Sequence, residues 1–89
     1  MTVPETQPYA AELARLRWRC RRGMHELDRV LEEFLARSFA SLSDADKSRF
    51  AAILDLPDPD LYGYLAGRME PPDQGSAALI ARIRAAAAF

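Results

Sequence analysis

The sequence predicts a small all-α protein, a single-domain five-helix bundle. Alanine and leucine dominate its 89 residues and β-branched residues are few, which favours helices over strands. Apolar residues recur at spacings of three and four, the period of a helix with one buried face. Glycine, proline and capping residues separate five such segments. The length suits one domain, which we place over residues 9–89.

The first helix is expected over residues 9–21. Residues 1–8 contain two prolines and no apolar period, so we expect a flexible N-terminal tail. Within the helix, Leu13, Leu16 and Cys20 fall at spacings that place them on one side. This side is predicted to face the core.

Trp18 lies nearly opposite that apolar side, at about 100° per residue. Arg15 and Arg22 flank it at positions i−3 and i+4. One interpretation is an exposed binding surface, because aromatic and arginine side chains dominate interface hot spots. The other is that Trp18 packs beneath another helix while the arginines keep their charged ends in water.

Gly23 interrupts the pattern, and the second helix is expected over residues 24–39. Glycine can end a helix with a positive φ, or it can cap the next helix. The second helix carries the strongest apolar stripe of the chain and is predicted to be the hydrophobic centre. The stripe comprises Met24, Leu27, Leu31, Phe34, Leu35 and Phe39.

Three further helices are marked by their ends. Ser43 is a good N-cap for the third helix, which Pro57 closes. The fourth helix is expected to have Asp58 as its N-cap, with a proline at its first position, and to end at Gly67. The fifth begins within residues 73–76. The inward residues of these helices are Phe50, Ile53, Leu54, Leu61, Leu65, Leu79, Ile80 and Ile83.

Charge is distributed unevenly along the chain. The net charge is −1, which argues against simple electrostatic binding to nucleic acid as the function of the whole protein. Residues 1–23 nevertheless hold five arginines against two glutamates, whereas residues 44–73 hold seven acidic residues against three basic ones. The arginine-rich first helix therefore keeps one alternative open, a small helical nucleic-acid-binding or regulatory module.

Cys20 is the only cysteine, which excludes an internal disulfide and favours a reducing compartment. The N-terminus lacks the basic start and apolar run of a secretory signal. Apolar stretches also stay short of the ~20 residues that span a bilayer. We therefore expect a cytoplasmic protein that does not insert into membranes.

Catalytic and cofactor sites are poorly supported. His25 and Cys20 are the only histidine and cysteine, and no third residue is identifiable to orient them. Two such ligands would not close a zinc site. Gly63 and Gly67 fit neither phosphate-loop spacing. The sequence predicts a protein that is not an enzyme, binds no metal and holds no cofactor stably.

The segment Arg22-Gly23-x-x-Glu26 has two interpretations. In the structural one, Gly23 is the N-cap and Glu26, at N3, accepts from the N–H of Gly23 as in half of a capping box. In the functional one, Gly23 lets a partner approach closely, while Arg22 and Glu26 bind it from either side.

At this segment the chain resembles the succinate dehydrogenase FAD assembly factor family, in its bacterial branch. The family hallmark is an RGxxE motif, here Arg22-Gly23-Met24-His25-Glu26. The segments 15–24, 42–44 and 58–65 are also similar to family landmarks, in the same order. The resemblance covers most of residues 13–83.

The resemblance implies a dedicated assembly chaperone. Such a factor binds the flavoprotein subunit of succinate dehydrogenase, and in some bacteria that of fumarate reductase, and promotes covalent attachment of FAD to it. The motif residues are expected at the partner interface, joined by neighbours that we add from their position and by two weaker tyrosine candidates. The set is Arg22, Gly23, Glu26, Trp18, Arg15, Arg21, Tyr62 and Tyr64.

Overall fold

The computed structural model describes residues 6–87 and is all-α over that range, as predicted. Five α-helices and one short 3-10 helix follow one another, with no strand among the described residues. They are α1 (Thr6–Arg19), α2 (His25–Ser38), η1 (Phe39–Ser41), α3 (Asp44–Ile53), α4 (Asp58–Leu65) and α5 (Gln74–Ala87). None of these helices is both long enough and apolar enough to cross a bilayer.

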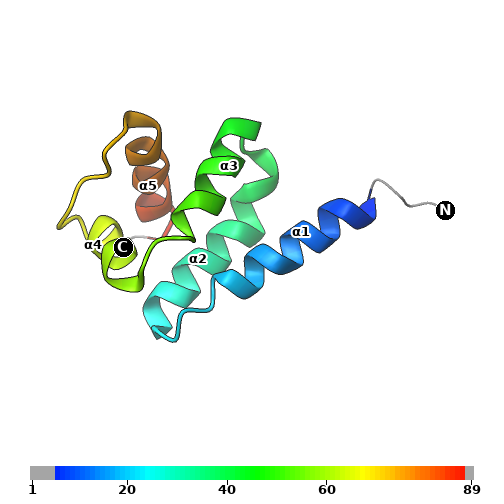
Figure 1. The fold of residues 1–89 in the computed structure, drawn as a ribbon, viewed down its shortest axis with the longest axis horizontal. Coiled ribbons are helices and arrows are strands. Elements are labelled where there is room, and N and C mark those ends of the chain that lie inside the picture. The colour runs from blue at the N-terminus through cyan, green and yellow to red at the C-terminus, as the bar shows by residue number, and fades with distance from the viewer. Residues whose placement is uncertain (1–5, 88–89) are drawn as a thin grey trace.

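Helix α2 is the hydrophobic centre, as its stripe predicts, but Met24 was wrongly included in that stripe, because it precedes the helix as its N-cap and is exposed. It packs against both α1 and α5, and α5 in turn packs against α3 and α4 (Figure 1). The ring centroid of Phe50, in α3, lies 5.8 Å from that of Phe34 in α2 and 5.7 Å from that of Phe39 in η1. Burial of these rings and of the leucines around them is the main source of stability.

Helix α1 begins earlier and ends earlier than expected. It starts at Thr6 rather than at residue 9, and a proline in the first turn is tolerated because its missing N–H would have no helical partner there. The rest of the expected tail, residues 1–5, lies outside the described residues. The helix ends at Arg19, so Arg21 and Arg22 belong to the turn before α2. In Figure 1, α1 diverges from α2 toward its N-terminal end.

The N-terminus of α3 is as predicted, and that of α4 is shifted by one residue. Ser43 Oγ accepts the backbone N–H of Asp46 at 3.1 Å, which confirms Ser43 as the N-cap. In α4 the N-cap is Pro57, and Asp58 is already the first helical residue. Asp58 makes no cap, and its carboxylate binds elsewhere, as described below.

Gly67 terminates α4, as expected, and lies two residues after Leu65, the last residue of the helix. Gly67 has a φ of +78°, the left-handed conformation that a helix C-terminus favours in glycine. The N–H of Arg68 donates to Gly63 O at 2.9 Å, and that of Gly67 donates to Tyr64 O at 3.2 Å. These two bonds form a Schellman motif, which satisfies the last carbonyls of the helix.

Candidate partner-binding site

The turn between α1 and α2 is built on Gly23, whose φ is +85°. A Cβ on this residue would have no described atom within 4 Å, so crowding does not require the glycine. The backbone conformation does, because L-residues with a side chain are strained at this φ. Gly23 is exposed, and the turn is open to an approaching partner.

Arg22, in contrast, points into the protein, with a side chain only 12% exposed. Its Nε donates to Asp58 Oδ1 at 2.8 Å. Its Nη1 donates to Leu54 O at 2.7 Å and to Arg19 O at 3.0 Å, and its Nη2 donates to Leu56 O. The guanidinium has five N–H groups, and these bonds engage four of them. The motif arginine thus joins the α1–α2 turn to the segment between α3 and α4.

Asp28 holds the same turn from the α2 side. Its Oδ1 accepts the N–H of Arg22 at 2.7 Å, and its Oδ2 accepts the N–H of Gly23 at 3.2 Å. The structural interpretation of the motif, a half capping box from Glu26, is therefore wrong. Helix α2 has Met24 as its N-cap, so Glu26 is only the second helical residue, and the carboxylate that reaches back is the one at Asp28.

Glu26 is left facing solvent. It is exposed, and its carboxylate makes no hydrogen bond or ion pair with any residue of the described range 6–87. Its place in the first turn of α2 is favourable for a carboxylate, because the helix N-terminus carries positive partial charge. An unpaired carboxylate beside an open glycine turn is available to a partner.

Trp18 also faces solvent, so it does not pack beneath another helix. It is 71% exposed, and Arg15 lies beside it on an open, shallow depression of about 370 Å³. The guanidinium that approaches the indole is that of Arg21, with Cζ 5.9 Å from the ring centroid. Arg22 does not flank Trp18, because the chain leaves the helix after Arg19.

Two of the five arginines in residues 15–22 donate hydrogen bonds to backbone carbonyls of this chain. Besides Arg22, Arg19 donates to Ala51 O at 2.9 Å and forms an ion pair with Asp55. Arg21 lies 3.6 Å from a carboxylate oxygen of Glu32. The arginine-rich segment is therefore less available to phosphates than its sequence suggests, and this weakens the nucleic-acid alternative.

The model of the family described as the flavinator of succinate dehydrogenase matches residues 14–87. The chain belongs to this family. Several curated relatives, among them the following three, carry the name FAD assembly factor SdhE. The protein of Coxiella burnetii is 41% identical over 78 residues, which are 88% of this chain and 93% of that protein. The protein of Shewanella oneidensis is 40% identical over 76 residues, 85% and 93% of the two chains. That of Xylella fastidiosa strain 9a5c is 42% identical over 80 residues, 90% and 82%.

Membership in the flavinator family confirms the resemblance drawn from the RGxxE segment. The residues of that motif differ in where they lie. Arg22 is directed inward, whereas Gly23 and Glu26 are at the surface. The exposed Trp18 and Arg21 lie on the α1 side of the same turn.

The two tyrosine candidates lie on α4 and are both half-buried. Tyr64 packs against the core and lines a groove of about 170 Å³ with Leu56, Pro71 and Pro72. Residues 15–26 contribute nothing to that groove. Tyr62 lies beneath Arg68, whose Cζ is 5.7 Å from the ring centroid.

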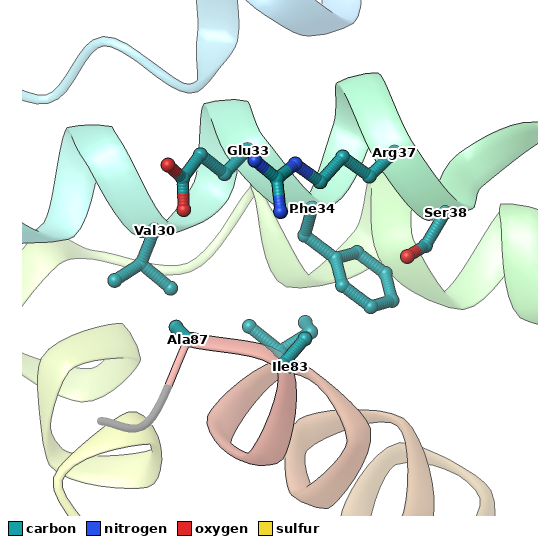
Figure 2. A pocket seen from close by; sticks show the side chains of 8 residues that line it. Val30, Glu33, Phe34, Arg37, Ser38, Ile83 and Ala87 are labelled. Atoms are coloured by element: carbon teal, nitrogen blue, oxygen red, sulfur yellow. The ribbon is translucent and has the colours of Figure 1, made fainter.

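A smaller groove separates α2 from α5. Figure 2 shows the Phe34 ring pointing from α2 toward Ile83 of α5, with Glu33 and Arg37 on the α2 side. Its volume is about 70 Å³. Small-molecule sites typically measure ~300–1,000 Å³, so this groove is packing space rather than a ligand site.

Cys20 is fully buried, as its place on the apolar side predicts. Burial, with the Glu32 carboxylate nearby, raises the pKa of the thiol to about 12. Such a thiol is neutral and unreactive near neutral pH. Among the described residues, no three His, Cys, Asp or Glu side chains are grouped to hold a metal ion.

Sequence reasoning missed two residues that build this site, Asp28 and Asp58. The signal for Asp28 was its place in the first turn after a glycine, where a carboxylate can accept free N–H groups. Asp58 was assigned to a helix cap, and nothing local indicates that it pairs with a side chain 36 positions earlier.

Proposed function

We propose that this chain is a FAD assembly factor that binds the flavoprotein subunit of succinate dehydrogenase and promotes its covalent FAD attachment. The observation that carries the proposal is the exposed, unpaired Glu26 beside the open Gly23 turn, within the motif of the flavinator family. A carboxylate with no role in holding its own fold is a candidate for contact with a partner. The flavoprotein subunit of fumarate reductase is a second candidate partner.

The binding surface that we propose is the exposed side of the α1–α2 corner. Glu26 and Gly23 form its centre, Arg21 adjoins them in the turn, and Trp18 and Arg15 extend it along α1. Tryptophan and arginine are the residue types that most often dominate binding energy. Arg22 supports this surface from within, and Tyr62 and Tyr64 are outlying candidates on α4.

The proposed mechanism is that of a chaperone, not an enzyme. The chain supplies no catalytic group and holds no FAD stably. It binds one conformation of the flavoprotein more tightly than the others, so that this conformation becomes more populated. The attachment reaction itself is carried out by the flavoprotein, in the cytoplasm.

The test is in-gel flavin fluorescence of the denatured flavoprotein subunit from cells that lack this chain. Cells are complemented with wild type, Glu26→Ala or Glu33→Ala. Glu33 is an exposed carboxylate of the same helix that pairs with Arg29 at 3.6 Å, so its variant controls for loss of one negative charge. We expect fluorescence to return with wild type and Glu33→Ala but to be strongly reduced with Glu26→Ala.

Two results would contradict the proposal in different ways. Fluorescence that is equally strong without any complement would exclude a role in flavin attachment. Full rescue by Glu26→Ala would keep that role but remove Glu26 from the binding surface. Direct binding of the purified chain to the FAD-loaded flavoprotein subunit, measured by calorimetry, then shows whether the partner or the residue was misassigned.

A further inference from the structure

Two guanidiniums join the α1–α2 corner to the C-terminal end of α3 and to the segment that follows it. Arg19 donates to Ala51 O at 2.9 Å, and Arg22 donates to Leu54 O at 2.7 Å and to Leu56 O. The last carbonyls of a helix have no partner within the helix and carry negative partial charge. Cationic donors from another segment satisfy these carbonyls and fix the corner relative to α3.

Asp58 completes this attachment from the start of α4. Its Oδ1 accepts from Arg22 Nε at 2.8 Å, while the other two nitrogens of that guanidinium donate to carbonyls. A planar guanidinium with acceptors on all sides has one favourable orientation. The carboxylate thus determines where the Arg22 side chain lies.

Asp28 acts on the backbone of the same turn. Its two oxygens accept the consecutive N–H groups of Arg22 and Gly23. Gly23 is the residue whose backbone has most freedom to change, and Glu26 follows it by three positions. Together, Asp28 and Asp58 hold the turn from two elements, and both residues are half-buried.

We propose that Asp28 and Asp58 are positioning residues for the partner-binding site. They hold Arg22 and the Gly23 turn so that Glu26 and Trp18 are presented to the flavoprotein in one fixed arrangement. A surface held in its bound shape loses less conformational entropy on binding, so its affinity is higher. This inference rests on the function proposed above and extends it to residues outside the RGxxE motif.

The test compares Asp58→Ala and Asp28→Ala with Asp60→Ala. Asp60 lies two residues after Asp58 in the first turn of α4, so its variant removes the same charge from the same helix end without touching Arg22. Dissociation constants for the purified flavoprotein subunit are measured at a temperature where circular dichroism shows every variant to be folded. Exchange of the Arg22 and Gly23 amide protons in the free chain is followed by NMR.

We expect Asp58→Ala and Asp28→Ala each to raise the dissociation constant about tenfold, and Asp60→Ala to change it less than about twofold. Asp58→Asn should recover most of the affinity, because an amide oxygen can still accept from Arg22. The amide protons of the turn should exchange faster in both alanine variants. If an alanine variant does not fold, Asp58→Asn and Asp28→Asn are measured instead, and an intermediate loss is expected.

Wild-type affinity in Asp58→Ala and Asp28→Ala, with Glu26→Ala still defective, would overturn the inference and leave the proposed function standing. An equal loss in Asp60→Ala would also overturn it, since charge at the helix end would then explain the effect. If Glu26→Ala and Trp18→Ala bind as tightly as wild type, the proposed surface itself is wrong, and the positioning role fails with it.

Discussion

Arg22 and Asp58 lie 36 positions apart in the chain and are joined by a 2.8 Å hydrogen bond from Nε to Oδ1. The bond gives the first residue of the RGxxE motif an internal role, because the remaining guanidinium bonds also end on this chain's own oxygens. The motif therefore combines a residue that holds the corner with residues that face outward. The two roles predict different consequences of mutation.

Arg22→Ala should destabilise the protein by about 2–4 kcal/mol, since it leaves a carboxylate and three backbone carbonyls without their donor in a mostly buried place. Arg22→Lys should recover only part of this, because an ammonium cannot reproduce the planar set of donors. The measurement is urea unfolding followed by circular dichroism. Arg17→Ala is the control, because Arg17 is exposed and its side chain makes no hydrogen bond or ion pair to a described residue. This variant should stay within about 0.5 kcal/mol of wild type. A stable Arg22→Ala that fails to bind the flavoprotein would instead place the side chain at the interface.

Gly23→Ala should cost about 1–2 kcal/mol through its positive φ alone, because the space around a Cβ is open. Gly23→Asn should cost less, since asparagine tolerates this conformation better than alanine. Unfolding free energies of the two variants separate strain from crowding, and equal costs would argue against strain. Flavin attachment is then measured for Gly23→Asn. A stable but inactive Gly23→Asn would show that the partner excludes any side chain at this turn.

The fold was predictable because its determinants are local. The stripe of α2, the Ser43 cap and the Gly67 end follow from spacing and residue type, and all three are confirmed apart from Met24, which is exposed. The corner was only partly predictable. Its residues Arg22 and Gly23 were identified, but the Arg22 side chain is oriented by Asp58 and by carbonyls just after α3, more than 30 positions away. Side-chain bonds over such separations leave no periodic signal in one sequence.

Trp18→Ala should leave the stability within about 0.5 kcal/mol of wild type, because the indole is 71% exposed and packs against little. It should weaken flavoprotein binding more than tenfold if Trp18 is a hot spot, as exposed aromatic residues at interfaces often are.

Trp18 is the only tryptophan of the chain, so fluorescence tests its exposure directly. The emission of the free protein should shift little when urea unfolds it, since the indole is already in water. A large shift to longer wavelength would show that Trp18 is buried and would remove it from the proposed surface.

The buried thiol of Cys20 should lower the free energy of unfolding in alkaline solution. Burial raises the pKa of its thiol from 9.0 in the unfolded chain to about 12 in the folded one. Between these values the unfolded chain releases a proton that the native state retains, so the free energy of unfolding falls by about 1.4 kcal/mol per pH unit from this group. Below pH 9 the contribution is constant.

The measurement is urea unfolding from pH 8 to pH 11 for wild type and Cys20→Ala, which differ only in this thiol. The stability difference between the two should move in favour of the variant as the pH rises. A difference that stays constant, or rapid alkylation of the native thiol at pH 8, would mean that Cys20 is accessible and that the end of α1 is not packed as described.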